Sequence, residues 1–148
     1  MASDASWVRD QVKAALVSPG FEVIEVARGQ DVRQVVDEVE PDLVVVDLQI
    51  GNMGGMAVSI DLRLEESAGR LPHVPILLLL DRVADKFLAR SAQADAILVK
   101  PFDPGTLRRT VKNLIAAEEA RRAAEEAEEA EDESGEEAGE ALEEPAPA

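Results

Sequence analysis

Three short apolar runs, separated by segments with helical spacing, constrain the fold of this 148-residue chain more than any other feature. The runs are "DLVVVDL" (42–48), "VPILLLLD" (74–81) and "AILVK" (96–100). Nearly continuous apolar runs of this length are typical of parallel strands that are covered on both faces. Because helical patterns alternate with them, the sequence predicts an α/β protein with helices on both faces of a parallel sheet.

The remaining segments extend this alternation toward both ends of the chain. Apolar residues recur at helical spacing in 5–17, 29–40, 56–66 and 82–93, and a last helix is expected to start near Pro104 with Asp103 as its cap. The segment "FEVIEVA" (21–27) alternates apolar and polar residues, which predicts a half-buried strand. The predicted order is that of a doubly wound, flavodoxin-like sheet, apart from its first element.

The first strand of such a sheet is central, yet only Met1 and Ala2 precede Ser3, Asp4 and the first helix. The sequence therefore predicts a first strand that is truncated or missing, which would leave ladder groups of its neighbours unpaired. We expect the recorded start to lie downstream of the true one. A four-stranded sheet that a partner strand completes is the alternative.

Most of the negative charge lies near the C-terminus. Residues 118–148 contain 14 Asp/Glu and two Arg, a net charge of −12, whereas residues 1–117 have a net charge of −4. We expect a folded domain over 1–116 and an acidic extension over 117–148, helical to about Asp132 and disordered beyond it. Such acidity repels phosphates, so no nucleic-acid or membrane partner is expected. The chain has no cysteine, no signal peptide and no membrane-spanning run, which predicts a cytoplasmic protein.

Polar side chains follow each of the three buried strands. They are Asp47, Asp81 and Lys100, and Asp4 would join them after a preceding strand. The carboxyl ends of parallel strands meet at one edge of a sheet. Carboxylates and an ammonium at that edge can hold a hard divalent cation and a phosphoryl group. Taken singly, Asp47 also fits a strand-end cap, and Lys100 fits an ordinary solvated strand end.

The combination resembles the receiver domain of two-component response regulators, from about Ser3 to Leu114. The stretch "VVVDLQIGNMGG" is similar to the phosphoacceptor strand and loop of that family, and "LVKPF" (98–102) is similar to its Lys-Pro motif. The resemblance implies that Asp47 accepts a phosphoryl group and that Lys100 contacts the phosphate. It also implies a Mg²⁺ site formed by Asp4, Asp47 and the backbone carbonyl of Gln49.

Several positions depart from the pattern of that family. Ser3 stands where the family has a second acid, which predicts weaker Mg²⁺ binding. Leu80 replaces a Ser/Thr hydroxyl and Ile97 replaces an aromatic residue, so both positions of the usual switch are aliphatic. Gly54 and Gly55 replace an Asp-Gly pair, and we expect them to permit positive φ in a mobile loop. The segment between Leu80 and Lys100 is short, which predicts an abbreviated fourth helix.

The resemblance implies a non-enzymatic, stand-alone receiver in two-component phosphorelay signalling. A histidine kinase or phosphotransfer protein would supply the phosphoryl group, and output would pass by contact to an unknown downstream protein. The alternative is a pseudo-receiver, an interaction module that works without phosphorylation. A flavodoxin-like enzyme or cofactor binder is a third hypothesis, but "GNMGG" lacks the spacing of a phosphate-binding glycine loop.

Three further predictions concern the surface. The resemblance places a docking or homodimer face on the fourth helix, fifth strand and fifth helix, with basic residues that could attract an acidic partner or the acidic extension: Arg90, Arg108, Arg109 and Lys112. His73 is expected to be a surface residue without a metal role. Trp7 is expected to cover the core at the end of the sheet that holds the site.

Overall fold

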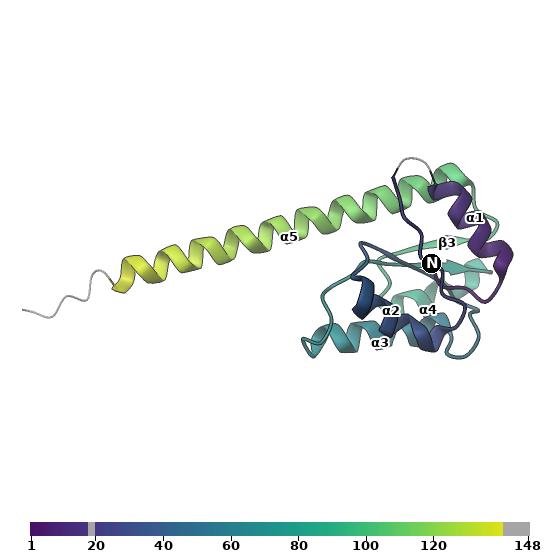
Figure 1. The fold of residues 1–148 in the computed structure, drawn as a ribbon, viewed down its shortest axis with the longest axis horizontal. Helices are drawn as coiled ribbons and strands as arrows, with labels where there is room; N and C mark the ends of the chain where they lie inside the picture. The colour runs from purple at the N-terminus through teal and green to yellow at the C-terminus, as the bar shows by residue number, and fades with distance from the viewer. Residues whose placement is uncertain (18–19, 141–148) are drawn as a thin grey trace, which may run out of the picture. The chain divides into compact units, whose positions relative to one another are not determined.

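The computed structural model describes residues 1–17 and 20–140, which divide into two compact units after Ile115. The first unit is a parallel sheet with helices on both faces (Figure 1). Its elements are α1 (Ser6–Leu16), η1 (Gly29–Asp31), α2 (Val32–Val39), β1 (Val44–Asp47), α3 (Gly55–Ser67), β2 (Ile76–Leu80), η2 (Val83–Asp85), α4 (Lys86–Ser91), β3 (Ala96–Val99) and the start of α5 (Pro104–Glu140). The predicted α/β alternation is confirmed, and α4 is as short as expected.

The sheet has the doubly wound order, with a very short first strand. Strands β1, β2 and β3 lie side by side and parallel. Ala2 forms parallel bridges to Val26 on one side and to Val46 of β1 on the other. The Ala2 amide donates to the Val45 carbonyl (2.8 Å), and the Asp47 amide donates to the Ala2 carbonyl (2.9 Å). The first strand is therefore truncated, as predicted, and it occupies the central position.

The predicted strand at 21–27 is wrong, because only Val26 forms a bridge. The Val26 amide donates to the Met1 carbonyl (2.9 Å), and the Ser3 amide donates to the Val26 carbonyl (3.0 Å). A strand needs a neighbour of similar length to satisfy its backbone groups. Residues 1–3 provide so short a neighbour that the ladder ends at Ile24, whose carbonyl accepts from the Met1 ammonium (2.8 Å).

Two apolar clusters cover the two faces of the sheet. Helix α1 and the first turns of α5 pack on one face, around Val8, Leu77 and Leu107. Helices α2, α3 and α4 pack on the other face, around Val36 and Leu78. In Figure 1, α1 lies above the sheet and α2, α3 and α4 lie below it.

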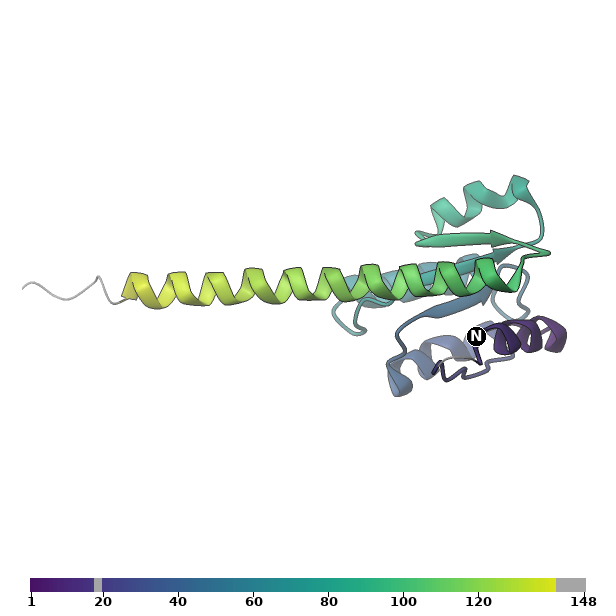
Figure 2. The same ribbon diagram turned by 90° about the horizontal axis from the view of Figure 1, so that it is seen from above.

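Strand β3 differs from its prediction as a fully covered strand. It lies at an edge of the sheet, next to α4 (Figure 2), and each of its four residues is half-buried. An edge strand has a neighbour on one side only, so side chains of an apolar run can remain partly exposed.

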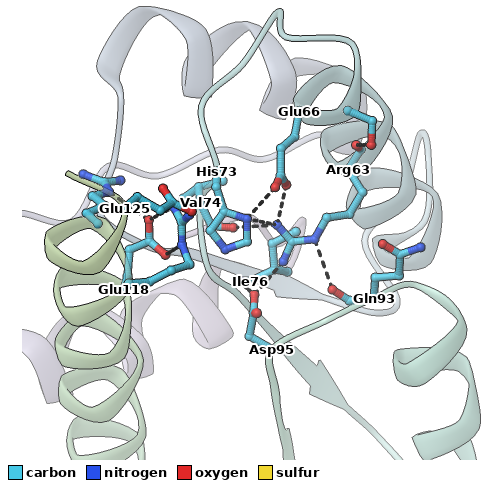
Figure 3. Close-up of polar contacts among 12 residues, drawn as sticks. Arg63, Glu66, His73, Val74, Ile76, Gln93, Asp95, Glu118 and Glu125 are labelled. Carbon is cyan, nitrogen blue, oxygen red and sulfur yellow. Dashed lines mark hydrogen bonds and ion pairs between the residues drawn. The ribbon is translucent and has the colours of Figure 1, made fainter. Parts of the chain in front are cut away.

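A polar cluster joins α3 to the amino-terminal end of β2 (Figure 3). The Arg63 guanidinium donates to Asp95 Oδ2 (2.6 Å), to the Val74 carbonyl (2.9 Å) and to Glu66 Oε2 (3.0 Å). Asp95 Oδ2 also accepts from the Ile76 amide (2.7 Å). The cluster lies at the amino-terminal ends of the strands, whereas Asp47 lies at their carboxyl ends, because Ile76 begins β2 and Asp47 ends β1.

His73 is more enclosed than a surface residue. Its side chain is 23% exposed, and its Nδ1 lies 2.6 Å from Glu66 Oε1. Burial is the largest single influence on the pKa of Glu66 and raises it, but the hydrogen bonds and charges of His73 and Arg63 together outweigh burial and lower this pKa. No group of three metal-ligating side chains occurs in the described residues, at His73 or elsewhere.

The acidic segment is helical over a longer stretch than the sequence predicts. Helix α5 continues beyond Asp132 to Glu140, so the prediction of disorder does not hold for 133–140, and 141–148 lie outside the described residues. Glu118 pairs with Arg121 (2.7 Å) and Arg122 (2.8 Å), one turn away. Alanine and glutamate are strong helix formers, and Gly135 and Gly139 each oppose them by only about 1 kcal/mol. No helix in the described ranges is long and apolar enough to cross a membrane.

Candidate functional site

The carboxylate of Asp47 lies at the centre of the candidate site. Asp47 is the last residue of β1 and is 2% exposed. Its Oδ1 accepts from Lys100 Nζ (2.8 Å) and from the Gln49 amide (3.1 Å), while its Oδ2 accepts from Ser3 Oγ (2.9 Å). A carboxylate oxygen has about two acceptor positions, so Oδ2 keeps one that no described residue occupies.

Lys100 links two carboxylates at the ends of neighbouring strands. It follows β3, and its Nζ lies 2.8 Å from Asp47 Oδ1 and 3.2 Å from Asp81 Oδ1. The Lys100 amide donates to the Leu80 carbonyl (2.7 Å), which fixes the backbone beside β2. The peptide bond to Pro101 is cis. The sheet therefore brings together the three strand-end groups that the sequence singles out.

Asp4 contacts the loop that follows β1. Its Oδ2 accepts from the Gly51 amide (3.1 Å), so this carboxylate lies beside the loop that follows β1. Arg9 Nη1 donates to the Ser3 carbonyl (2.6 Å), which holds the turn between the first strand and α1. Asp4 is exposed, in contrast to Asp47.

The groups around Asp47 have the chemistry of a Mg²⁺ site. Asp4, Asp47 and the Gln49 carbonyl offer oxygen ligands only, and Mg²⁺ takes one or two carboxylates and completes its shell with water. Ser3 contributes a hydroxyl where a third carboxylate would add charge. The residues present therefore fit a magnesium ion with two acidic ligands.

The loop after β1 adopts a conformation that its glycines do not explain. Positive φ occurs at Asn52 (55°) and Met53 (104°), whereas Gly54 has a φ of −61°. The prediction that Gly54 and Gly55 provide positive φ is therefore wrong. Gly55 is needed for close approach instead, because a Cβ there would lie 2.5 Å from the Asp47 carbonyl oxygen.

The two aliphatic switch positions lie in the apolar core. Leu80, the last residue of β2, is fully buried, and Ile97 of β3 packs against the same cluster. Neither side chain can donate a hydrogen bond. Among the described residues, the hydrogen bonds to the Asp47 carboxylate come from Ser3, Gln49 and Lys100.

Sequence reasoning missed two features of the site. Ser3 was expected only to weaken a metal site, yet its buried hydroxyl anchors Asp47. Trp7 was expected to cover the core, but it is 57% exposed and its ring centroid lies 6.0 Å from Lys100 Nζ. The position of Trp7, three residues after Asp4 and on the first turn of a helix next to the site, could have indicated that its ring lies near the site.

Comparisons with known proteins agree with this geometry. The family model of the response regulator receiver domain matches residues 1–112. Among relatives, the transcriptional regulatory protein GltR of Pseudomonas aeruginosa is 31% identical over 117 residues, which are 78% of this chain and 47% of that protein. The aerobic respiration control protein ArcA of Escherichia coli K12 is 27% identical over 118 residues, with 78% and 47% covered. The chain thus spans about half the length of these relatives.

A solved structure shows the same fold. The chemotaxis response regulator CheY4 of Vibrio cholerae superposes with a TM-score of 0.68 at 24% identity, covering 76% of this chain and 93% of that one. The family match extends over most of the chain and includes Asp47, at the end of β1, and Lys100, which follows β3. The chain therefore belongs to the response regulator receiver domain family, which acts in two-component signal transduction.

Proposed function

We propose that residues 1–116 form a stand-alone receiver that accepts a phosphoryl group on Asp47 and signals through protein contact. The observation that carries the proposal is the ion pair between Lys100 Nζ and Asp47 Oδ1 at 2.8 Å, with Asp81 at 3.2 Å. This arrangement places a fixed cation beside a carboxylate that keeps one unoccupied acceptor position. A nucleophilic carboxylate and a charge-neutralising partner are what phosphoryl acceptance requires.

The chemistry follows from the oxygens of Asp47. Oδ2 forms the new bond to phosphorus through its remaining lone pair, while the bond from phosphorus to the donor's leaving group breaks. On a phosphohistidine donor the leaving group is an imidazole nitrogen, which keeps the bonding electron pair. The Lys100 ammonium neutralises charge on a phosphoryl oxygen in the transition state and in the aspartyl phosphate. Ser3 and the Gln49 amide orient the carboxylate during this step.

Magnesium belongs to the proposal as a weak ligand of the same site. Asp4, Asp47 and the Gln49 carbonyl would hold the ion, and a bound ion would screen the charge of the incoming phosphoryl group. Asp4 Oδ2 accepts a hydrogen bond from the Gly51 amide (3.1 Å), and a bound ion would share this oxygen or break that bond. We therefore expect Mg²⁺ binding to be coupled to the conformation of the loop after β1.

The proposed partners are proteins. A histidine kinase or a phosphotransfer protein would supply the phosphoryl group, in the cytoplasm, and an unknown downstream protein would receive the signal. The basic residues Arg90, Arg108, Arg109 and Lys112 are exposed and could contribute to docking or to homodimer formation. A nucleic-acid output is disfavoured because the described part of residues 117–148 contains 12 acidic residues and two arginines.

A pseudo-receiver remains the second candidate function, because of Leu80 and Ile97. Both are aliphatic and pack in the core, so neither can bond a phosphoryl oxygen or report its arrival. In this case the fold would bind its partner without phosphorylation.

Phosphoryl acceptance is tested by incubating the protein with Mg²⁺ and acetyl phosphate. We expect a mass increase of one phosphoryl group in the intact protein, and none in the Asp47→Asn variant. Asp81→Asn serves as the matched control, because it removes a carboxylate that pairs with Lys100 but is not the acceptor. The absence of an Asp47-dependent adduct, in a protein with a normal circular dichroism spectrum, would favour the pseudo-receiver.

A further inference from the structure

The loop after β1, residues 49–54, is fastened to the start of η1. The Gly29 amide donates to the Gly51 carbonyl (3.2 Å), and the Gln30 amide donates to the Asn52 carbonyl (3.1 Å). The first amides of a helical segment have no partner inside it, so these two loop carbonyls satisfy them. We call this pair of hydrogen bonds the clasp. Because α2 begins directly after η1, the clasp ties the loop to α2.

Gly29 is buried, and the clasp leaves no room for a side chain there. A Cβ on Gly29 would overlap the Met53 carbonyl oxygen, and it would lie 3.0 Å from the Met53 carbonyl carbon and 3.1 Å from a methyl group of Val58. Because the closest contacts are with backbone atoms, a change of side-chain rotamer cannot relieve them. Any side chain at position 29 must therefore push the loop away from η1.

The loop has a conformation that its surroundings must maintain. Asn52 has a φ of 55° and Met53 a φ of 104°. Positive φ at residues other than glycine is unfavourable, and it persists where the surrounding contacts impose it. The hydrogen bond to the Asn52 carbonyl and the close approach of the Met53 carbonyl to Gly29 are such contacts. Opening the clasp would therefore let this part of the loop relax.

The same loop carries groups of the proposed magnesium site. The Gly51 amide donates to Asp4 Oδ2 (3.1 Å), and the Gln49 amide donates to Asp47 Oδ1 (3.1 Å). The Gln49 carbonyl, which would be a ligand of the ion, also belongs to this loop. A carboxylate oxygen has about two acceptor positions, so Asp4 Oδ2 can keep the Gly51 amide while it binds an ion. Loss of groups that hold metal ligands in place typically weakens metal binding about 10–100-fold.

We propose that Gly29 is a positioning residue for the magnesium site and that the clasp couples this site to α2. The inference rests on the proposed function, because it takes Asp4, Asp47 and the Gln49 carbonyl as the ligands. By closing the clasp, Gly29 holds the Gly51 amide against Asp4 and fixes the direction of the Gln49 carbonyl. Coupling between two sites is reciprocal, so bound Mg²⁺ tightens the clasp and protects its amides from exchange.

Hydrogen exchange of the wild-type chain tests the coupling to α2. We expect saturating Mg²⁺ to slow exchange of the Gly29 and Gln30 amides at least threefold. The Gln93 amide, which bonds a carbonyl in the turn that ends α4, should exchange at an unchanged rate. Asp4→Asn should abolish the effect of Mg²⁺. Unchanged exchange of the Gly29 and Gln30 amides in the wild type would overturn the proposal, even if a Gly29 variant does not fold.

Matched glycine variants test the positioning role. The Mg²⁺ dissociation constant is measured from the shift of the Gln49 amide in ¹⁵N spectra. Gly29→Ala should raise this constant at least fivefold. Gly54→Ala, in the loop itself, should change it less than twofold, because Gly54 has a φ of −61° and its Cβ would lie 3.7 Å from the Leu48 carbonyl oxygen. At saturating Mg²⁺, acetyl phosphate should phosphorylate Gly29→Ala at a rate within threefold of the wild type.

The outcomes separate this inference from the proposed function. Equal Mg²⁺ dissociation constants in folded Gly29→Ala and in the wild type would overturn the positioning role and leave phosphoryl acceptance on Asp47 untouched. Absence of Asp4-dependent Mg²⁺ binding in the wild type would refute the positioning role and the magnesium site together.

Discussion

Replacing Lys100 with methionine should destabilise the receiver unit strongly. The substitution keeps most of the apolar stem and removes the ammonium that joins Asp47 to Asp81. The Asp47 side chain is 3% exposed, so its charge would remain in the interior without a cation. Removing one partner of a buried pair costs about 3–5 kcal/mol. We expect about 3 kcal/mol, because the Lys100 side chain retains 11% exposure and two other donors still bond Asp47.

Substitution of the acidic partner, Asp47, should destabilise the protein much less. Asp47→Asn removes the buried charge and keeps one carbonyl oxygen for Lys100 and the Gln49 amide, while its amide group can donate to Ser3 Oγ. Lys100 also stays paired with Asp81 at 3.2 Å. We expect a loss of about 1 kcal/mol or less in the free energy of unfolding. The double variant should recover at least about 1 kcal/mol relative to Lys100→Met alone, since the uncompensated carboxylate is gone.

Urea unfolding followed by far-ultraviolet circular dichroism measures these differences. Trp7 fluorescence is less suitable as the main probe, because its ring lies 6.0 Å from Lys100 Nζ and responds to the substitution itself. Lys112→Met is the matched control, and its exposed position predicts a change below about 0.5 kcal/mol. If Asp47→Asn destabilised the protein as much as Lys100→Met, the interpretation of Lys100 as the countercharge of a buried carboxylate would be wrong.

Three other predictions concern positions away from Asp47. Ser59 is fully buried, and its Oγ has no hydrogen-bond partner in the described structure. Ser59→Ala should therefore raise the free energy of unfolding by about 1 kcal/mol. The control Ser67→Ala, on the exposed surface of α3, should change it little. The folded pKa of the Met1 ammonium, about 6, lies below its ordinary 8.0, so the unfolded chain binds more protons between these values. The free energy of unfolding should therefore be about 2 kcal/mol higher at pH 8 than at pH 6. Urea titrations at the two pH values measure this difference, and N-terminal acetylation should remove it. Asp95→Ala should cost about 2 kcal/mol in thermal or urea unfolding, because Asp95 accepts from both Arg63 and the Ile76 amide; an unchanged midpoint would show that the cluster contributes nothing.

Sequence patterns predicted the sheet well where burial alone determines the structure. The runs that contain Val45 and Leu78 are apolar on both faces, and few structures other than a covered strand can accommodate them. The same logic placed Asp47 and Lys100 at one edge, since parallel strands end on the same side. These predictions needed no knowledge of which residues are neighbours across the sheet.

Features that depend on a neighbour far away in the chain were missed. The alternation in 21–27 suits a strand, but the partner that it needs is only three residues long. Ser3 looks like a lost acid until the fold places its hydroxyl 2.9 Å from Asp47 Oδ2, 44 residues later. Positive φ at Met53 was unexpected because the loop also contains Gly54, the residue type that adopts this conformation at least cost.

The hydrogen bonds of Asp47 also limit how a phosphorylated site could signal. A phosphoryl group on Oδ2 would compete with Ser3 for that oxygen and would draw Lys100 away from Oδ1, since a phosphate carries more charge than a carboxylate. Lys100 also contacts Asp81 and the exposed ring of Trp7, so its movement would alter both. Leu80 and Ile97 offer no polar group to follow such a movement. Any rearrangement on phosphorylation is therefore expected at the rim formed by Lys100 and Trp7, and Trp7 fluorescence with beryllofluoride should change in the wild type but not in Asp47→Asn.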